Sequence, residues 1–120
     1  MFQTWGIIKY GENSCRAWLD DEIGKYYRSL LPKAWGVQPP MHTTHVSIVR
    51  VFEKPNRLYW KKYEGSTIEV IYYPSMQTNG LYFWLNCMSD DIERIRKEMG
   101  LSIFRSTFST HHITVGNLKN

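Results

Sequence analysis

One residue pattern occurs twice in this chain, in the stretch at 44–49, which reads Thr-His-Val-Ser-Ile-Val, and in its counterpart at 112–115, which reads His-Ile-Thr-Val. In each stretch a histidine, an apolar residue, a hydroxyl residue and a second apolar residue follow one another. Successive side chains of a β-strand point to opposite faces. We therefore predict two strands in which the histidine and the hydroxyl residue share one face and the apolar residues are buried.

The polar residues of these strands are His45 and Ser47 in the first and His112 and Thr114 in the second. Histidine titrates near neutral pH, so one of two facing imidazoles can act as a base while the other acts as an acid. Serine and threonine hydroxyls can donate hydrogen bonds to phosphate oxygens and stabilise the charge that builds in the transition state. This scheme requires no metal, and we expect no cofactor.

The rest of the chain indicates one α+β domain over 1–120, with pseudo-repeat halves at about 1–75 and 76–120. Periodicity and turn residues predict strands over 3–10, 43–52, 67–73, 81–87 and 103–108 and a last strand ending at 116, and helices that begin after the caps Asp20 and Ser89. Whether 15–19 extends the first helix backward is left open. The order gives a βαββ unit twice, which predicts two lobes in a bilobal sandwich around a central cleft.

Composition limits the function classes. A hydrophobic content of 42% and an aromatic content of 15% are typical of a folded protein with rings available for stacking, and the net charge of +4 fits either an anionic partner or plain solubility. Cys15 and Cys87 lie far apart without metal-binding spacing, which favours reduced thiols in the cytoplasm. No export signal or membrane-spanning run is evident, so we expect neither a membrane nor an obligate protein partner.

The paired motifs resemble the His-x-Thr/Ser signatures of the two-histidine (2H) phosphoesterases, a superfamily of two-lobed enzymes. It includes LigT-like RNA ligases, cyclic-nucleotide and 2′-5′-oligonucleotide phosphodiesterases, and small phage enzymes that destroy the cyclic oligonucleotide signals of bacterial antiviral (CBASS) defence. The resemblance covers the whole chain and implies a metal-independent phosphodiesterase that acts on a nucleotide or oligonucleotide. It implies that His45 and His112 are the acid/base pair and that Ser47 and Thr114 bind phosphate. A viral member would act in the host cytoplasm.

Further substrate contacts are nominated from position. Tyr10 closes the first predicted strand, Tyr73 and Trp84 offer surfaces on which a base could stack, and Arg105 precedes the second motif strand, where it could meet a phosphate. Core packing for Trp84 and a solvated surface position for Arg105 are the competing interpretations.

Two other functions remain open. Four histidines, His42, His45, His111 and His112, could in principle bind a metal, although no carboxylate accompanies them and adjacent residues of a strand point to opposite faces. His42 is otherwise expected at the rim, just after Pro39 and Pro40. The other alternative is a non-catalytic RNA- or nucleotide-binding module in which the motifs serve only as a phosphate cradle.

Overall fold

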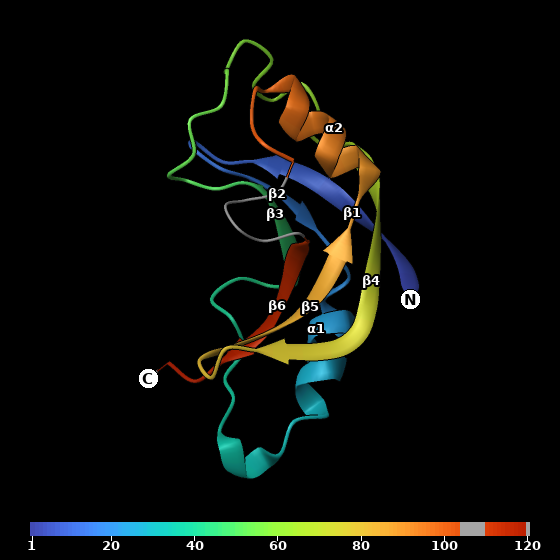
Figure 1. Ribbon diagram of the computed structural model, residues 1–120, viewed down its shortest axis with the longest axis vertical. Helices are drawn as coiled ribbons and strands as arrows, with labels where there is room; N and C mark the ends of the chain where they lie inside the picture. Colours follow the sequence, from blue (N-terminus) through green and yellow to red (C-terminus); the bar gives the residue numbers. More distant parts are fainter. Residues whose placement is uncertain (104–109, 120) are drawn as a thin grey trace.

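A computed structural model of the chain describes residues 1–103 and 110–119. Within these ranges six strands form one closed antiparallel barrel, and three helical segments pack around it (Figure 1). The strands are β1 (Phe2–Tyr10), β2 (Cys15–Trp18), β3 (His45–Val49), β4 (Thr67–Thr78), β5 (Tyr82–Met88) and β6 (His111–Asn117). The helices are α1 (Asp21–Ser29), the short 3-10 helix η1 (Lys33–Trp35) and α2 (Asp90–Glu98).

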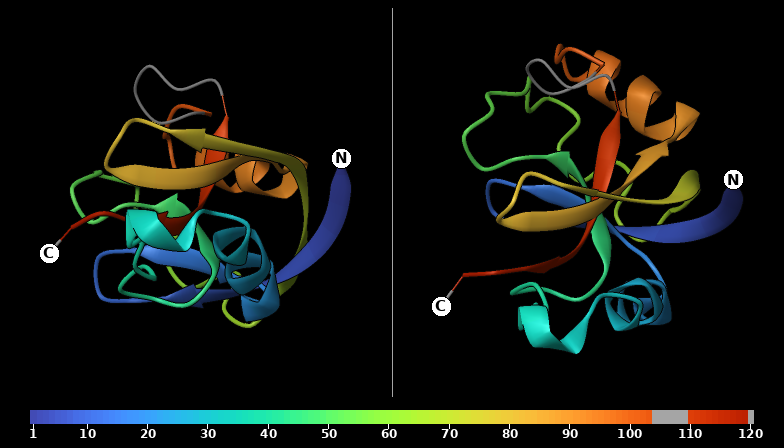
Figure 2. Two further views of the ribbon diagram at one scale, coloured as in Figure 1. Left: turned by 90° about the horizontal axis from the view of Figure 1, so that it is seen from below. Right: turned by 60° about the horizontal axis from the view of Figure 1, so that its bottom comes forward.

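The strand order around the barrel is β1-β2-β3-β6-β5-β4. Along the chain the elements repeat as strand, strand, helix, strand: β1-β2-α1-β3 is followed by β4-β5-α2-β6. Strands β1, β2 and β3 of the first half thus correspond to β4, β5 and β6 of the second. The order around the barrel is symmetric about the boundary between β3 and β6. Figures 1 and 2 show the two α-helices toward opposite ends of the barrel.

The predicted fold, a sandwich of two βαββ lobes around a cleft, is wrong. The repeated unit is ββαβ, and the strands enclose a packed core in place of a central cleft. Residues 15–18 form the hairpin partner β2 of β1, with Ile8 opposite Ala17, and do not extend the helix. The predicted strand over 103–108 falls mostly on residues outside those that the structure describes.

Closure of the barrel depends on β4, which pairs with β1 through residues 67–72 and with β5 through residues 71–78. A turn is predicted from Pro74 onward, yet the strand continues past it to Thr78. A register shift between Tyr72 and Met76 accommodates this passage, because proline has no N–H to donate and is tolerated at bulges. The shift also lets one strand serve both neighbours, so no long strand edge is left unpaired.

The helix starts agree with the sequence. The side chain of Asp20 accepts a hydrogen bond from the N–H of Glu22 at 3.0 Å, and that of Ser89 accepts one from the N–H of Ile92 at 3.2 Å. Each satisfies one of the backbone donors that a helix leaves unpaired at its first turn. Both predicted caps are therefore confirmed.

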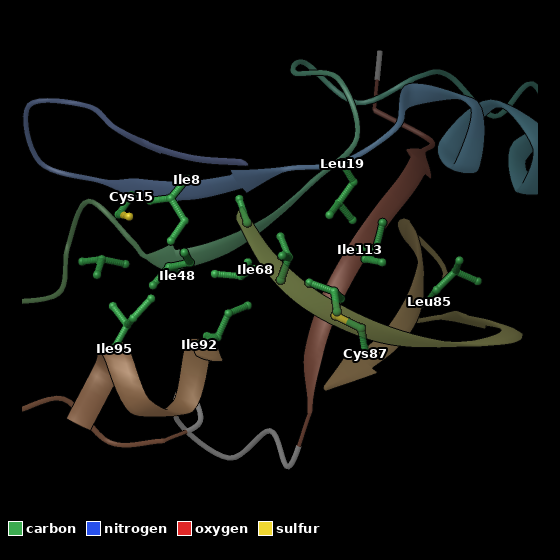
Figure 3. Close-up of a cluster of buried hydrophobic side chains, with 14 of the residues drawn as sticks. Ile8, Cys15, Leu19, Ile48, Ile68, Leu85, Cys87, Ile92, Ile95 and Ile113 are labelled. Atoms are coloured by element: carbon green, nitrogen blue, oxygen red, sulfur yellow. The ribbon is translucent and has the colours of Figure 1, made fainter. Parts of the chain in front are cut away.

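The core fills the barrel and continues beneath α2. Figure 3 shows Ile92 and Ile95 of α2 pointing into the same cluster as Ile48 of β3 and Ile113 of β6. Ile48, Ile92 and Ile113 are 0% exposed. Burying a side chain of this size contributes about 1.5–3 kcal/mol, so the apolar positions of the two motif strands hold them firmly in the barrel wall.

Candidate active site

The two motif strands, β3 and β6, are neighbours in the barrel and run antiparallel, with Val46 opposite Ile113. Counting outward from that pair places each histidine opposite the hydroxyl residue of the other motif, His45 opposite Thr114 and Ser47 opposite His112. The two histidines are then diagonal neighbours on one face, a relation in which residues lie about 7–8 Å apart and their Cβ atoms somewhat closer. Two imidazoles at this separation can contact opposite sides of one phosphate group.

The predicted alternation of faces is confirmed. His45 and Ser47 are half-buried, as are His112 and Thr114. The apolar residues of both motifs, by contrast, are completely buried: Val46, Ile48, Ile113 and Val115. The polar residues thus lie on the outer face of the barrel, where a ligand can reach them, while their roles in catalysis stay predictions.

On one side the outer face continues onto β2, which places Trp18 opposite His45 and Arg16 opposite Ser47. The rings of Trp18 and His45 have centroids 5.1 Å apart, and the guanidinium carbon of Arg16 lies 5.9 Å from the centroid of the Trp18 ring. We call these four residues the β3 half of the site. It combines an imidazole and a hydroxyl with a cation and a large aromatic surface.

On the other side the face continues onto β5, which places Trp84 opposite Thr114 and Asn86 opposite His112. The Trp84 ring stacks on the His112 ring, with centroids 4.8 Å apart and planes inclined by 23°. The indole Nε1–H of Trp84 donates to Oδ1 of Asn86 at 3.1 Å, which fixes the orientation of the stacked ring. We call these four residues the β6 half of the site.

The imidazole of His45 has a defined tautomer and a lowered pKa. Its Nδ1 lies 2.8 Å from the carbonyl oxygen of Thr43, and a carbonyl can only accept, so Nδ1 carries the proton. In the neutral ring the lone pair is then on Nε2. Burial lowers the pKa of His45, and the nearby cations Arg16 and Arg50, together with His42, lower it further against the opposing effect of the Thr43 carbonyl. His45 is accordingly held in its neutral form near pH 7.

Sequence reasoning placed His42 at the rim. The side chain is exposed, and its ring centroid lies 6.0 Å from that of His45 and 6.1 Å from that of Trp18. His42 therefore borders the β3 half.

The four residues nominated as substrate contacts lie in different parts of the molecule, and only one of them contacts a motif histidine in the described structure. Trp84 belongs to the outer face and contacts His112, so the competing prediction of core packing is wrong for it. Tyr10 packs edge-on against Trp60, with ring centroids 5.0 Å apart, and burial raises its pKa to about 12. Tyr73 lies exposed on β4, a strand that pairs with β1 and β5 and not with β3 or β6. Arg105 lies outside the described residues.

The residues that sequence reasoning missed are Arg16, Trp18 and Asn86. The segment that holds Arg16 and Trp18 reads Cys-Arg-Ala-Trp, and its Cys15 and Ala17 are fully buried while the other two are not. This period of two was the available signal for a strand. Asn86 follows Trp84 by two residues and so shares its face.

The alternative metal site does not assemble from the four histidines. His111 is buried on the core side of β6, whereas His112 lies on the outer face. Across residues 1–103 and 110–119, no three histidine, cysteine or acidic side chains gather as they would around a metal ion. Within the same residues, no helix has the length and apolar character needed to cross a membrane.

Comparisons with protein-family models, with curated proteins and with solved structures find no match for this chain. Functional arguments accordingly rest on the geometry of the outer face.

Proposed function

We propose that this chain is a phosphodiesterase that cleaves a nucleotide phosphodiester by general acid–base catalysis with His45 and His112, without a metal. The observation that carries the proposal is the pairing of β3 with β6, in which Val46 lies opposite Ile113. This register brings two histidine–hydroxyl pairs, separated by more than half the chain, into one four-residue cluster on an accessible face. The cluster has the two proton-transfer groups and the two hydrogen-bond donors that phosphoryl transfer without a cofactor needs.

In the proposed reaction a phosphate group lies over the β3–β6 boundary, and Ser47 and Thr114 donate hydrogen bonds to its non-bridging oxygens. Nε2 of His45 removes the proton from the attacking water or ribose hydroxyl. His112, from the other side, gives a proton to the leaving oxygen as its bond to phosphorus breaks. The lowered pKa of His45 and its fixed Nδ1–H support the base role for this residue, which leaves the acid role to His112.

The substrate class that we propose is a cyclic oligonucleotide or an RNA end with a 2′,3′-cyclic phosphate or a 2′-5′ linkage. The net charge of +4 favours an anionic substrate. Trp18 and Trp84 are half-buried on the outer face, one in each half of the site, and base–aromatic stacking contributes about 1–3 kcal/mol per base. Cys15 and Cys87 are both free and buried, which suits the reducing cytoplasm as the place of action.

The test is a hydrolysis screen in the presence of a chelator, with cyclic di- and trinucleotides, 2′-5′ oligoadenylate and an RNA with a 2′,3′-cyclic phosphate. The wild type is compared with His45→Ala and His112→Ala, and circular dichroism confirms that each variant is folded. Arg94→Ala is the control, because Arg94 is exposed on α2. We expect turnover by the wild type and the control, and a loss of about 10²–10⁴-fold in each histidine variant.

Wild-type rates in either histidine variant would refute the proposed roles. Loss of turnover on chelation with recovery in zinc would refute the metal-free reaction. Binding of these ligands without turnover by the wild type would instead identify a nucleotide-binding module that uses the same cluster as a phosphate cradle.

A further inference from the structure

A pocket of about 260 Å³ adjoins the catalytic cluster at the end of β3. Its lining comes from the β1–β2 turn, from β2 and β3, and from the residues that follow β3: Ser14, Arg16, Ser47, Val49, Arg50, Val51 and Phe52. Strands β2 and β3, which supply two of its walls, lie side by side (Figure 1). The pocket shares Ser47 with the catalytic cluster, so whatever fills it lies next to the phosphate being cleaved.

The charge of this pocket is positive. Among the described residues that line it, two are arginines and none has a carboxylate. The nearest acid along the chain is Glu53, whose Oε2 is 2.6 Å from the guanidinium of the buried Arg96. Its Oε1 accepts the backbone N–H of Arg50 at 2.9 Å, so this carboxylate is shared between Arg96 and Arg50. Arg16 and Arg50 both lower the pKa of His45, so their charges lie close to the catalytic face.

The pocket is also partly apolar. Phe52 is 70% exposed and Val51 is 65% exposed, although both are large hydrophobic residues. Phe52 lines the same pocket as the two arginines. Proteins that bind single-stranded nucleic acid combine cations, which bind the phosphates, with aromatic rings, on which the bases stack. The volume is below the roughly 300–1,000 Å³ of sites that enclose a whole drug-sized ligand. It therefore suits one part of a larger substrate whose remainder lies on the catalytic cluster.

Arg16 provides a phosphate-binding position next to the one at Ser47. Arg16 lies directly opposite Ser47 on the neighbouring strand, and neighbouring strands are about 4.8 Å apart. Because an arginine side chain is long, the guanidinium group of Arg16 can bind a phosphate that lies farther from Ser47 than this strand spacing. Among the described residues the β6 half has no counterpart of Arg16, because Trp84 occupies the place opposite Thr114 that Arg16 occupies opposite Ser47. Substrate is thereby given a direction across the site.

We propose that the pocket is a second phosphate-binding subsite: Arg16 and Arg50 hold the phosphate next to the scissile one, and Phe52 stacks the attached base. This inference rests on the proposed function and sharpens it. Substrates then have at least two phosphates in sequence, as cyclic oligonucleotides and oligonucleotide chains do, and a mononucleoside 2′,3′-cyclic phosphate fills only half of the site.

The test compares the dinucleotide ApA, which has one phosphodiester, with pApA and ApAp, which add a terminal phosphate on either side. We expect the wild type to prefer one of the two phosphorylated dinucleotides over ApA by about tenfold or more in kcat/KM, because a hydrogen bond to a charged group is among the stronger ones. Arg16→Gln and Arg50→Gln should each remove most of that preference by raising KM for the preferred dinucleotide toward its value for ApA. Arg94→Gln, an exposed arginine on α2, is the matched control and should keep it.

A binding arm separates this inference from the proposed function. Calorimetric titration with the deoxy dinucleotides dApdA, pdApdA and dApdAp, which lack the 2′-hydroxyls, reports the subsite whether or not turnover occurs. Tighter binding of a terminally phosphorylated ligand to the wild type, lost in Arg16→Gln, supports the subsite even if the hydrolysis screen fails. Equal affinity for all three ligands, or a loss in the arginine variants that is the same for every ligand, overturns the subsite and leaves the two-histidine proposal standing.

Discussion

The two halves of the site are built on the same strand pattern but have different chemistry. In the β3 half, His45 has Trp18 beside it and the cation Arg16 one position along, whereas in the β6 half His112 lies against the neutral pair Trp84 and Asn86. Positive charge near an imidazole favours its neutral form, and an aromatic face and an amide carry no net charge. The strands beside two equivalent histidines thus give them different electrostatic surroundings, and it is on this difference that the proposed division into a base and an acid rests.

The largest effect that tests this comparison comes from the leaving group. On a nucleotide substrate we expect His45→Ala and His112→Ala each to lower kcat/KM by about 10²–10⁴-fold. On a p-nitrophenyl phosphodiester, nitrophenolate leaves without needing a proton. His112→Ala should then regain most of its rate, while His45→Ala should not. The measurement is kcat/KM of both variants and the wild type on both substrates.

If His45→Ala, and not His112→Ala, regained its rate on the p-nitrophenyl phosphodiester, His45 would be the acid and His112 the base. Equal losses on both substrates for both variants would contradict any division into acid and base. In either case the difference between the two halves would have to be explained by binding.

A second contrast concerns the buried residue that directly precedes each motif histidine in the sequence. At the corresponding buried positions β6 has His111, and the segment before β3 has Thr44, whose N–H and hydroxyl both donate to Oδ1 of Asp21 at 3.0 Å. Burial, with a further contribution from Arg96, lowers the pKa of His111 to about 4. Strand β6 therefore contains a buried titratable group at a position where the segment before β3 has a hydrogen-bonded threonine.

This contrast predicts acid sensitivity. Unfolded histidine has a pKa near 6.5, so between pH 6.5 and about 4 the unfolded chain takes up a proton at His111 that the folded chain does not. The free energy of unfolding is therefore highest above pH 6.5 with respect to this residue. It decreases as the pH drops toward 4, and His111 accounts for roughly 3 kcal/mol of the decrease. Urea unfolding at several pH values should show the fall, and His111→Asn should flatten it. An unchanged slope in that variant would assign the sensitivity to other groups.

The smallest expected effect concerns the pH dependence of activity. The ascending limb of kcat/KM reports a free-enzyme base, and the lowered pKa of His45 puts its midpoint below 6.5. Arg16→Gln removes a positive charge that lowers this pKa, so the limb should move to higher pH. Lys33→Gln, in η1, is the control and should leave it in place. A limb that does not move in Arg16→Gln would show that Arg16 does not contribute to the pKa of His45.

The sequence predicted the parts of this protein that depend on neighbouring residues. The alternation of polar and apolar residues in the two motifs put His45 and His112 on exposed faces, and the caps Asp20 and Ser89 marked both α-helices. It failed where a local pattern was too short or ambiguous. Four residues of β2 could equally have extended a helix, and Pro74 indicated a turn inside what is a continuous β4.

Which strands lie side by side was decided only by the tertiary structure. Side-chain alternation is a property of each strand by itself, and the same alternation is compatible with a two-lobed sandwich and with a closed barrel. The barrel results because β4 pairs with both β1 and β5 and because β3 meets β6 in one register. Strand pairing is a contact between residues far apart in sequence, so no local pattern specifies it. The sequence by itself determined which side chains face outward, and the tertiary structure decided that Arg16, Trp18, Trp84 and Asn86 surround the two histidines.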